Sequence, residues 1–246
     1  MRVFVTRATN EHLKTAHLLR QKGFEAVACP VLSICWAQDT PIFPSDTQAL
    51  LITSKNALRA LVRHPTFDPA SFTPPLIAVG AETAAFARRA GFPCVHNGGG
   101  TVADMLRFVA KTCCPFKGPL VYGRGLMVRE DIAFVLGEKG LRVAEKILYS
   151  FSPLGSLPSQ VKDQLKAGEL GAGIFLSHNV ASHFKVLAER EGLMDTLSGV
   201  YLCGLSAQVL APLTGWGRAH LVPPLPTLEG LLETLKMYSL SSKVLS

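Results

Sequence analysis

The sequence predicts an α/β protein made of two similar halves, because apolar runs alternate with helical patterns and because the chain repeats itself. Apolar residues make up 48% of the 246 residues, which is enough to bury a core in each half. Val, Ile, Leu, Phe and Ala dominate most of the runs, as is typical of parallel strands covered on both faces. The alternating order of strands and helices predicts right-handed crossovers between these strands.

The strands and helices follow from composition and from their end signals. Apolar runs predict strands at residues 2–6, 25–34, 49–53, 76–80, 119–123, 142–151, 173–177, 200–204 and 219–222. Helical patterns lie at residues 10–22, 55–63, 82–90, 101–111, 128–139, 179–191, 206–213 and 227–237. Asn10, Thr101 and Thr227 are expected N-caps, and glycines stand where helices should end, at Gly23, Gly91, Gly140 and Gly192.

The repeat has a long and slowly drifting offset. Val3–Arg7 corresponds to Leu120–Arg124 at an offset of 117 residues, and Thr101 corresponds to Thr227 at an offset of 126. A period of this length is too large for a solenoid unit and suits a duplicated half-protein. We therefore expect each half to present similar loops to a shared cleft.

Two segments break the rhythm of strands and helices. Residues 29–37 and 146–153 correspond to each other in the repeat and run past the expected end of a buried strand. They fit two connectors of a bilobal protein. The alternative is a pair of tandem domains divided near residues 115–118, and periodicity alone does not choose between the two.

Charge and composition narrow the class of partner. The formal net charge of +7 favours an anionic partner, and scattered Lys and Arg residues without an RNA motif favour a small acidic molecule over nucleic acid. No apolar run is long enough to cross a bilayer, and the N-terminus lacks an apolar signal segment, so we expect a soluble, cytoplasmic protein without a membrane partner. The six cysteines contain no CxxC pair and the seven histidines no HExxH, so no metal is expected.

Small polar or cationic residues follow almost every predicted strand. They occur at residues 6–7, 53–56, 80–83, 97–101, 123–125, 177–179, 204–206 and 226–227. Ligands of open parallel sheets lie beyond the carboxyl ends of strands, where helix N-termini attract anions. Each hydroxyl or amide could instead only cap its helix. The recurrence in both halves favours an extended anionic ligand held between two lobes.

Common catalytic motifs are absent from the sequence. Gly123-x-Gly125 has Val128 in place of the third glycine of a dinucleotide loop, and no Walker sequence occurs. Ser206 lies in Gly-Leu-Ser-Ala-Gln, which lacks the second glycine of a nucleophile elbow. An enzyme with this sequence would act by positioning and electrostatics.

The ordered motifs of the chain resemble the uroporphyrinogen-III synthase family from residue 3 to about residue 235. The resemblance rests on Val5-Thr6-Arg7, Thr53-Ser54-x-Asn56-Ala57, Val79-Gly80-x-x-Thr83-Ala84, Arg124-Gly125-x-x-x-Arg129, Leu148-Tyr149, Phe175-Leu176-Ser177 and Pro226-Thr227. Departures from the family pattern are Ala8 in place of a frequent proline, Lys55 in a variable position, and Leu205-Ser206-Ala207 where a Thr-Ala-like pair is common.

The resemblance implies two flavodoxin-like lobes joined by a two-stranded connector. Residues 1–30 with 154–246 would form the first lobe and residues 39–145 the second, with residues 31–38 and 146–153 as the connector strands. It also implies the reaction, which is cyclisation of the linear tetrapyrrole hydroxymethylbilane to uroporphyrinogen III with loss of water and inversion of ring D. This substrate is a polycarboxylate, and the implied enzyme is a lyase that needs no cofactor. We expect a monomer.

The candidate catalytic residue is Tyr149, for which the repeat offers Leu32 at the corresponding position, so the core does not itself require a phenol there. A phenol could assist departure of the leaving hydroxyl; an ordinary strand tyrosine with an exposed tip is the alternative. The candidate substrate-binding residues are Thr6, Arg7, Ser54, Thr83, Arg124, Arg129, Ser177, Ser206 and Thr227.

Two other functions share some of these features. A non-catalytic bilobal binding protein for an acidic ligand would have the same charge and polar strand ends. A two-lobed glycosyltransferase would usually need a longer chain and a nucleotide site, and no motif for such a site is present.

Overall fold

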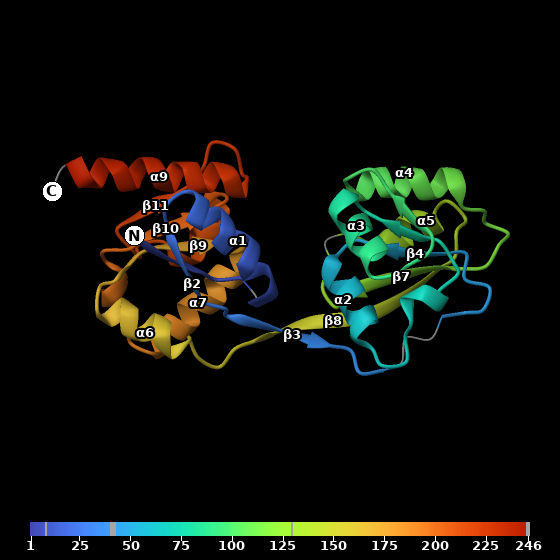
Figure 1. The fold of residues 1–246 in the computed structure, drawn as a ribbon, viewed down its shortest axis with the longest axis horizontal. Helices are drawn as coiled ribbons and strands as arrows, with labels where there is room; N and C mark the ends of the chain where they lie inside the picture. The colour runs from blue at the N-terminus through green and yellow to red at the C-terminus, as the bar shows by residue number, and fades with distance from the viewer. Residues whose placement is uncertain (8, 40–42, 129, 245–246) are drawn as a thin grey trace. The chain divides into compact units, whose positions relative to one another are not determined.

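The computed structural model describes residues 1–7, 9–39, 43–128 and 130–244 (Figure 1). It has a mixed α/β fold with two separate, predominantly parallel sheets. The chain divides into two compact units, which we call the first unit (Met1–Ser33 with Ser152–Ser246) and the second unit (Ile34–Phe151). The first unit is therefore built from two separate stretches of the sequence.

The first unit contains a five-stranded sheet in the order β11-β10-β9-β1-β2. Its neighbouring strands all run parallel. The strands are β1 (Arg2–Val5), β2 (Glu25–Ala28), β9 (Leu170–Phe175), β10 (Tyr201–Gly204) and β11 (Ala219–Leu221). Its helices are α1 (Thr9–Gln21), α6 (Ser159–Lys166), α7 (His178–Arg190), α8 (Ala207–Leu210) and α9 (Leu228–Val244), with short 3-10 turns η2 (Asp195–Leu197) and η3 (Ala211–Leu213).

Helices cover both faces of the first sheet because its strands are apolar on both faces. Phe4 of β1 packs in a core with α6 and α7, where Phe4 stacks on Phe184 with ring centroids 5.4 Å apart. Val3 and Val5 point to the other face, which α1 and α9 cover (Figure 1). This two-sided burial is the arrangement expected for a parallel sheet.

A six-stranded sheet in the order β3-β8-β7-β4-β5-β6 belongs mainly to the second unit, because only the outer ends of β3 and β8 fall in the first. The strands are β3 (Leu32–Trp36), β4 (Ala49–Ile52), β5 (Leu76–Ala78), β6 (Val95–Asn97), β7 (Leu120–Gly125) and β8 (Val143–Pro153). The helices are α2 (Lys55–Arg63), α3 (Ala81–Arg89), α4 (Val102–Thr112) and α5 (Ile132–Gly137), and η1 (Pro69–Ser71) is a 3-10 turn. Helices α2 and α3 pack on one face of the sheet, and α4 and α5 on the other.

The edge strand β3 runs opposite to its neighbour β8. Backbone hydrogen bonds join Leu154 N–H to the Val31 carbonyl and Ala37 N–H to the Leu148 carbonyl, at 3.0 and 2.9 Å. Strands β3 and β8 are therefore antiparallel. The remaining neighbours in this sheet are parallel.

Most predicted elements occur within one or two residues of their expected bounds, and the expected helix ends are confirmed. Gly23, Gly91, Gly140 and Gly192 all have positive φ, between 64° and 98°, just after α1, α3, α5 and α7. Only glycine adopts this conformation without strain, which explains why each helix stops there. Thr101 caps α4 in a reciprocal pair with Asp104, as expected.

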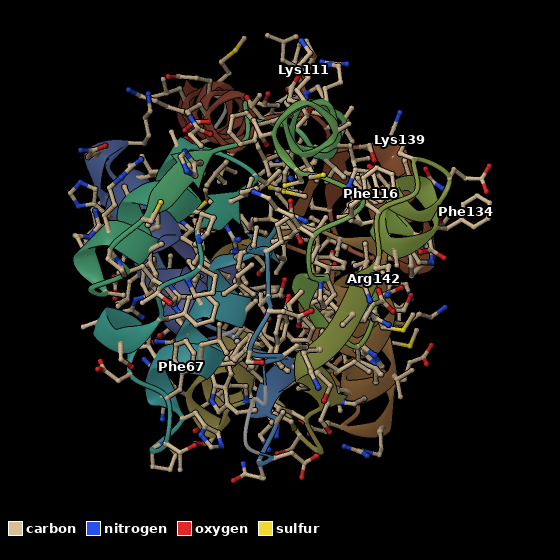
Figure 2. The ribbon with its side chains drawn as sticks, turned by 90° about the vertical axis from the view of Figure 1, so that its right-hand side faces the viewer. Phe67, Lys111, Phe116, Phe134, Lys139 and Arg142 are labelled. Carbon is tan, nitrogen blue, oxygen red and sulfur yellow. The ribbon has the colours of Figure 1, made fainter. Side chains whose placement is uncertain are left out.

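Several expectations about elements were wrong. Helix α1 begins at Thr9, so Asn10 lies inside the helix and is not its N-cap. The helix expected at 227–237 continues to Val244 as α9. The run 25–34 is divided into β2 and β3, because Pro30 between them has no N–H for a ladder. The helix expected at 128–139 covers only Ile132–Gly137, since Asp131 accepts the Phe134 N–H and caps a later start. Phe134 itself is 65% exposed and projects away from α5 (Figure 2).

Two elements of the structure, α6 and β6, were not expected. Helix α6 begins after Pro158 without a side-chain cap, so its N-terminus carries no polar start signal. It contributes Val161 and Leu165 to the core. Strand β6 has only three residues and two of them are exposed, which leaves no apolar run to detect.

Candidate functional site

Each sheet has one topological switch point, where successive strands of the chain stop being added on one side and begin to be added on the other. In the first sheet the switch point lies between β1 and β9, and in the second between β4 and β7. Loops leaving the carboxyl ends of such a strand pair diverge, which is why parallel sheets bind ligands there. Thr6 and Arg7 follow β1, and Ser177 lies just beyond β9. Ser54 follows β4, and Arg124 lies near the end of β7. The structure thus brings these predicted residues to the switch point of their own sheet.

Four predicted hydroxyl groups cap helices. The Ser54 Oγ accepts the Asn56 N–H at 3.1 Å, and the Thr227 Oγ1 accepts the Gly230 N–H at 3.0 Å. Ser177 and Ser206 accept the N–H groups three residues later, both at 3.4 Å. The capping role is therefore observed for these residues. A capping hydroxyl still carries its own proton and can donate one hydrogen bond to a ligand.

Thr6 and Thr83 are the two most buried of the predicted hydroxyl residues. Thr6 is 1% exposed, and its Oγ1 donates to the Ile174 carbonyl at 2.7 Å, so the side chain joins β1 to β9. A ligand contact from this hydroxyl would require that hydrogen bond to break. Thr83 lies in the first turn of α3 and is 7% exposed.

The guanidinium of Arg124 is held by the protein itself. Its Nη2 donates to Glu145 Oε2 at 3.0 Å, and its Nε lies 2.8 Å from Glu145 Oε1 without making a hydrogen bond, so the two residues form an ion pair with one hydrogen bond. Its Nη1 donates to the Gly125 and Leu126 carbonyls at 3.0 and 2.9 Å. This side chain therefore fastens the end of β7 to β8, and its charge is balanced by a carboxylate of the protein.

The other two predicted arginines are Arg7 and Arg129. Arg7 follows β1 and is partly buried. Arg129 lies outside the described residues.

Tyr149 lies on β8 and reaches the loop that follows β4. Its hydroxyl donates to the Ser54 Oγ at 3.2 Å. The ring is partly buried against the core beneath α2 and α3, with the Trp36 ring centroid 6.4 Å away. The predicted catalytic residue and one predicted binding residue are thus in direct contact.

A second tyrosine that sequence reasoning missed fixes the same loop from the other face of the sheet. The Tyr122 hydroxyl lies 3.1 Å from the Thr53 Oγ1, and Tyr122 is 3% exposed. Burial raises the pKa of the Tyr122 phenol, and the hydrogen bond with Thr53 opposes part of that rise. The sequence contains a signal for this residue, because Val5 stands at the position that corresponds to Tyr122 in the repeat, so the core does not require a phenol there.

Among the described residues there is neither a cluster of metal ligands nor a membrane-spanning helix. No three His, Cys, Asp or Glu side chains among them lie close enough together to hold a metal ion. No helix in that part of the chain is long and apolar enough to cross a membrane.

Comparison with known proteins finds one matching family and several similar solved structures. Residues 14–233 match the family described as Uroporphyrinogen-III synthase HemD. The search of curated proteins found no match. Uroporphyrinogen-III synthetase from Helicobacter pylori is similar in structure, at 18% identity and a TM-score of 0.60, with 98% of this chain and 100% of that chain covered. A mutant uroporphyrinogen III synthase from Thermus thermophilus has 18% identity and a TM-score of 0.50, with 98% and 99% covered. At 18% identity the two structures show only that the fold is shared. The family match covers most of the sequence and therefore shows the family. The chain therefore belongs to the uroporphyrinogen-III synthase HemD family.

Proposed function

We propose that this chain converts hydroxymethylbilane to uroporphyrinogen III, with loss of water and inversion of ring D. The family gives the chain a role in tetrapyrrole biosynthesis as a lyase. The single observation that carries the proposal is the match of residues 14–233 to this family. The geometry of the strand ends agrees with it, because hydroxyls and helix N–H groups that can bind carboxylates gather there.

We infer further that the chain is an internally duplicated, bilobal protein with flavodoxin-like lobes. The lobes would be residues 1–30 with 154–246 and residues 39–145, joined by the connector strands 31–38 and 146–153. The repeat matches β1 with β7 and β2 with β8, and it matches β9, β10 and β11 with β4, β5 and β6. With these matches, corresponding strands occur in the same order in the two sheets, β2-β1-β9-β10-β11 and β8-β7-β4-β5-β6. A crystal structure in which the two sheets failed to superpose in this pairing would contradict the duplication.

Residues of both units are proposed to bind the carboxylates of the substrate. The formal net charge of +7 favours association with such a polyanion. Arg7, Arg129 and Thr83 are proposed ligands, as are the capping hydroxyls of Ser54, Ser177, Ser206 and Thr227 with the helix N–H groups beside them. Thr6 and Arg124 are proposed to support the site through the strands that they join. Because the contacts are distributed, single Ala variants of the ligands should mainly raise KM by modest factors.

Tyr149 is proposed to hydrogen-bond the leaving hydroxyl of the substrate. Its phenol already donates a hydrogen bond, to the Ser54 Oγ at 3.2 Å. When the phenol donates to the substrate instead, Ser54 can reverse its role and donate to the phenol oxygen. The hydroxyl pair would then stabilise negative charge that develops on the phenol as water leaves.

Spontaneous closure of the linear substrate joins the rings in order and gives isomer I. Formation of isomer III requires ring D to be attacked at its substituted carbon, opened and rejoined in reverse. A site that holds the chain curled should favour this path by orientation. We therefore expect the purified protein to yield mostly isomer III, with turnover that survives a chelator and needs no nucleotide.

The deciding experiment is turnover of hydroxymethylbilane with the product isomers separated. Raised ionic strength should increase KM, because it screens the carboxylate contacts. A folded protein that gives only isomer I at the uncatalysed rate would remove the enzymatic proposal, and saturable binding of the substrate would then favour a non-catalytic binding protein. We also propose that the protein acts as a cytoplasmic monomer, which fractionation and light scattering would test.

A further inference from the structure

Strand β8 contains a bulge beside the end of β7. Arg124 pairs with Ile147, but the next residue, Gly125, pairs with Tyr149, so Leu148 is an extra residue in β8. An inserted residue interrupts the regular alternation of side chains between the two faces. Leu148 and Tyr149 are neighbours in sequence, yet both side chains contact the core beneath α2 and α3.

Each of these two side chains lies over a glycine of β7. A Cβ atom placed on Gly123 would be 2.8 Å from the Leu148 Cδ1, and one placed on Gly125 would be 2.8 Å from the Tyr149 Cζ. Real Cβ contacts are essentially never this short. Two glycines on one face of the strand therefore receive the two residues that the bulge turns to that face.

Position 125 requires a glycine because the Tyr149 phenol occupies the space of a side chain, and not because its backbone conformation excludes other residues. Gly125 is buried, and its φ is not among the positive values. An alanine could adopt that backbone, but its Cβ would lie 3.0 Å from the Tyr149 hydroxyl oxygen and 3.1 Å from Cε2. The part of the ring that crowds position 125 is its hydroxyl-bearing end.

We propose that Gly125 is a positioning residue that sets where the Tyr149 hydroxyl lies. This inference rests on the role of Tyr149 in the proposed function. The missing side chain of Gly125 leaves room for the ring on β7, and the Ser54 Oγ receives the hydroxyl at the tip. The Phe151 ring approaches from another side, at 90° and a centroid distance of 5.6 Å. The phenol is thus flanked by Gly125, by Phe151 and by the hydroxyl of Ser54.

A methyl group at position 125 would displace the phenol by a predictable amount. Ordinary contact begins at 3.4 Å, so a Cζ at 2.8 Å must move by about 0.6 Å. The hydrogen bond to Ser54 is already 3.2 Å long and would weaken with that movement. Misplacement of a reacting group by about 1 Å can cost on the order of a hundredfold in rate. Gly125→Ala should therefore lower kcat by roughly tenfold or more, with KM changed by less than about threefold.

Gly123→Ala is the matched control, because it adds the same methyl to the same strand and face. Its Cβ would meet the Leu148 Cδ1 at 2.8 Å and the Ile52 Cδ1 at 2.9 Å, which are apolar atoms. This variant should lose a comparable amount of stability, while its folded fraction keeps kcat within about twofold of the parent. Equal losses of kcat in the two variants would overturn the inference.

Removal of the Tyr149 hydroxyl distinguishes two causes of a lower kcat, which are misplacement of that hydroxyl and general damage to β7. In a Tyr149→Phe background there is no hydroxyl to misplace, so Gly125→Ala should lower kcat no further. An undiminished effect in that background would contradict the inference. If Gly125→Ala does not fold, the double variant with Tyr149→Ala should fold, because it removes the ring that the methyl strikes. Failure of that rescue would also contradict the contact.

A second readout does not depend on turnover. Tyrosine labelled with ¹³C at Cζ gives one NMR signal for each of the four tyrosines, and Tyr149→Phe assigns the relevant one. Gly125→Ala should shift this signal, whereas Gly123→Ala should leave it nearly in place. Normal turnover in Tyr149→Phe would end the catalytic role of Tyr149, while the NMR shift would still decide whether Gly125 positions the ring. An unshifted signal in Gly125→Ala would refute the positioning role itself.

Discussion

Replacing Arg124 by Met tests whether this arginine supports the protein or binds the substrate. Methionine keeps an unbranched stem of similar length but removes every donor of the guanidinium. The variant therefore loses the ion pair with Glu145 and the hydrogen bonds to the Gly125 and Leu126 carbonyls. All of these contacts lie within the second unit.

The expected loss of stability follows from the exposure of the partners. The Arg124 side chain is 15% exposed and that of Glu145 is 32% exposed, so solvent screens the ion pair in part. A well-formed pair of this kind contributes about 1 kcal/mol. Two hydrogen bonds from a charged donor to partly exposed carbonyls add about 1 kcal/mol each after the same discount. We expect the free energy of unfolding of the second unit to fall by roughly 2–3 kcal/mol.

The two tryptophans allow this loss to be measured in one unit at a time. Trp36 lies in the second unit and Trp216 in the first, so a Trp216→Phe background leaves Trp36 as the reporter of the second unit. Urea unfolding followed by Trp36 fluorescence should show a lower midpoint with an unchanged slope. Glu145→Gln should give a smaller loss, and the double variant should lose less than the sum of both. A large rise in KM with an unchanged midpoint would refute the supporting role and make Arg124 a substrate ligand.

Three further predictions concern single side chains. Thr6→Val should lower stability by about 1 kcal/mol and leave KM nearly unchanged, because the buried hydroxyl bonds to β9; a raised KM with unchanged thermal stability would instead make that hydroxyl a ligand. Ser177→Ala should cost about 1 kcal/mol by removing the cap of α7 and should raise KM modestly, as thermal unfolding and steady-state kinetics would show. A maleimide reagent should modify the exposed Cys35 in the native protein but not Cys29 or Cys203, whose thiols have pKa values raised by burial. Mass spectrometry after proteolysis would check this, and rapid labelling of Cys203 before unfolding would contradict it.

The elements of this fold could be predicted where local chemistry is strong. Glycines with positive φ end four helices, and the apolar runs of the central strands are unmistakable. The failures lie where local signals are weak. Strand β6 is short and mostly exposed, α6 has no capping side chain, and the apolar run through Pro30 hides a break between two sheets.

The candidate site was predictable by position but not by orientation. Topology brings strand ends to one edge, which predicts Ser54, whereas the repeat and the family resemblance pointed to Tyr149; their contact was not predictable. The partner of Arg124 could not, because Glu145 reaches it only through the register of β7 on β8. The placement of Tyr149 over Gly125 depends on a single inserted residue, which no periodicity reveals.

The interior position of β1 in its sheet, between β2 and β9, has a consequence for synthesis. β1 leaves the ribosome long before β9, but it lies between β2 and β9 and bonds across 168 residues, from Thr6 to Ile174. At about 5–20 residues per second, β1 waits roughly 10–30 s for that partner. Meanwhile the second unit is completed, and the apolar residues Val3, Phe4 and Val5 have β2 but not β9 to pair with. The nascent chain is therefore most exposed to aggregation at its first strand, and chaperone supply or a lower growth temperature should govern the yield of folded protein more than the stability of the finished fold.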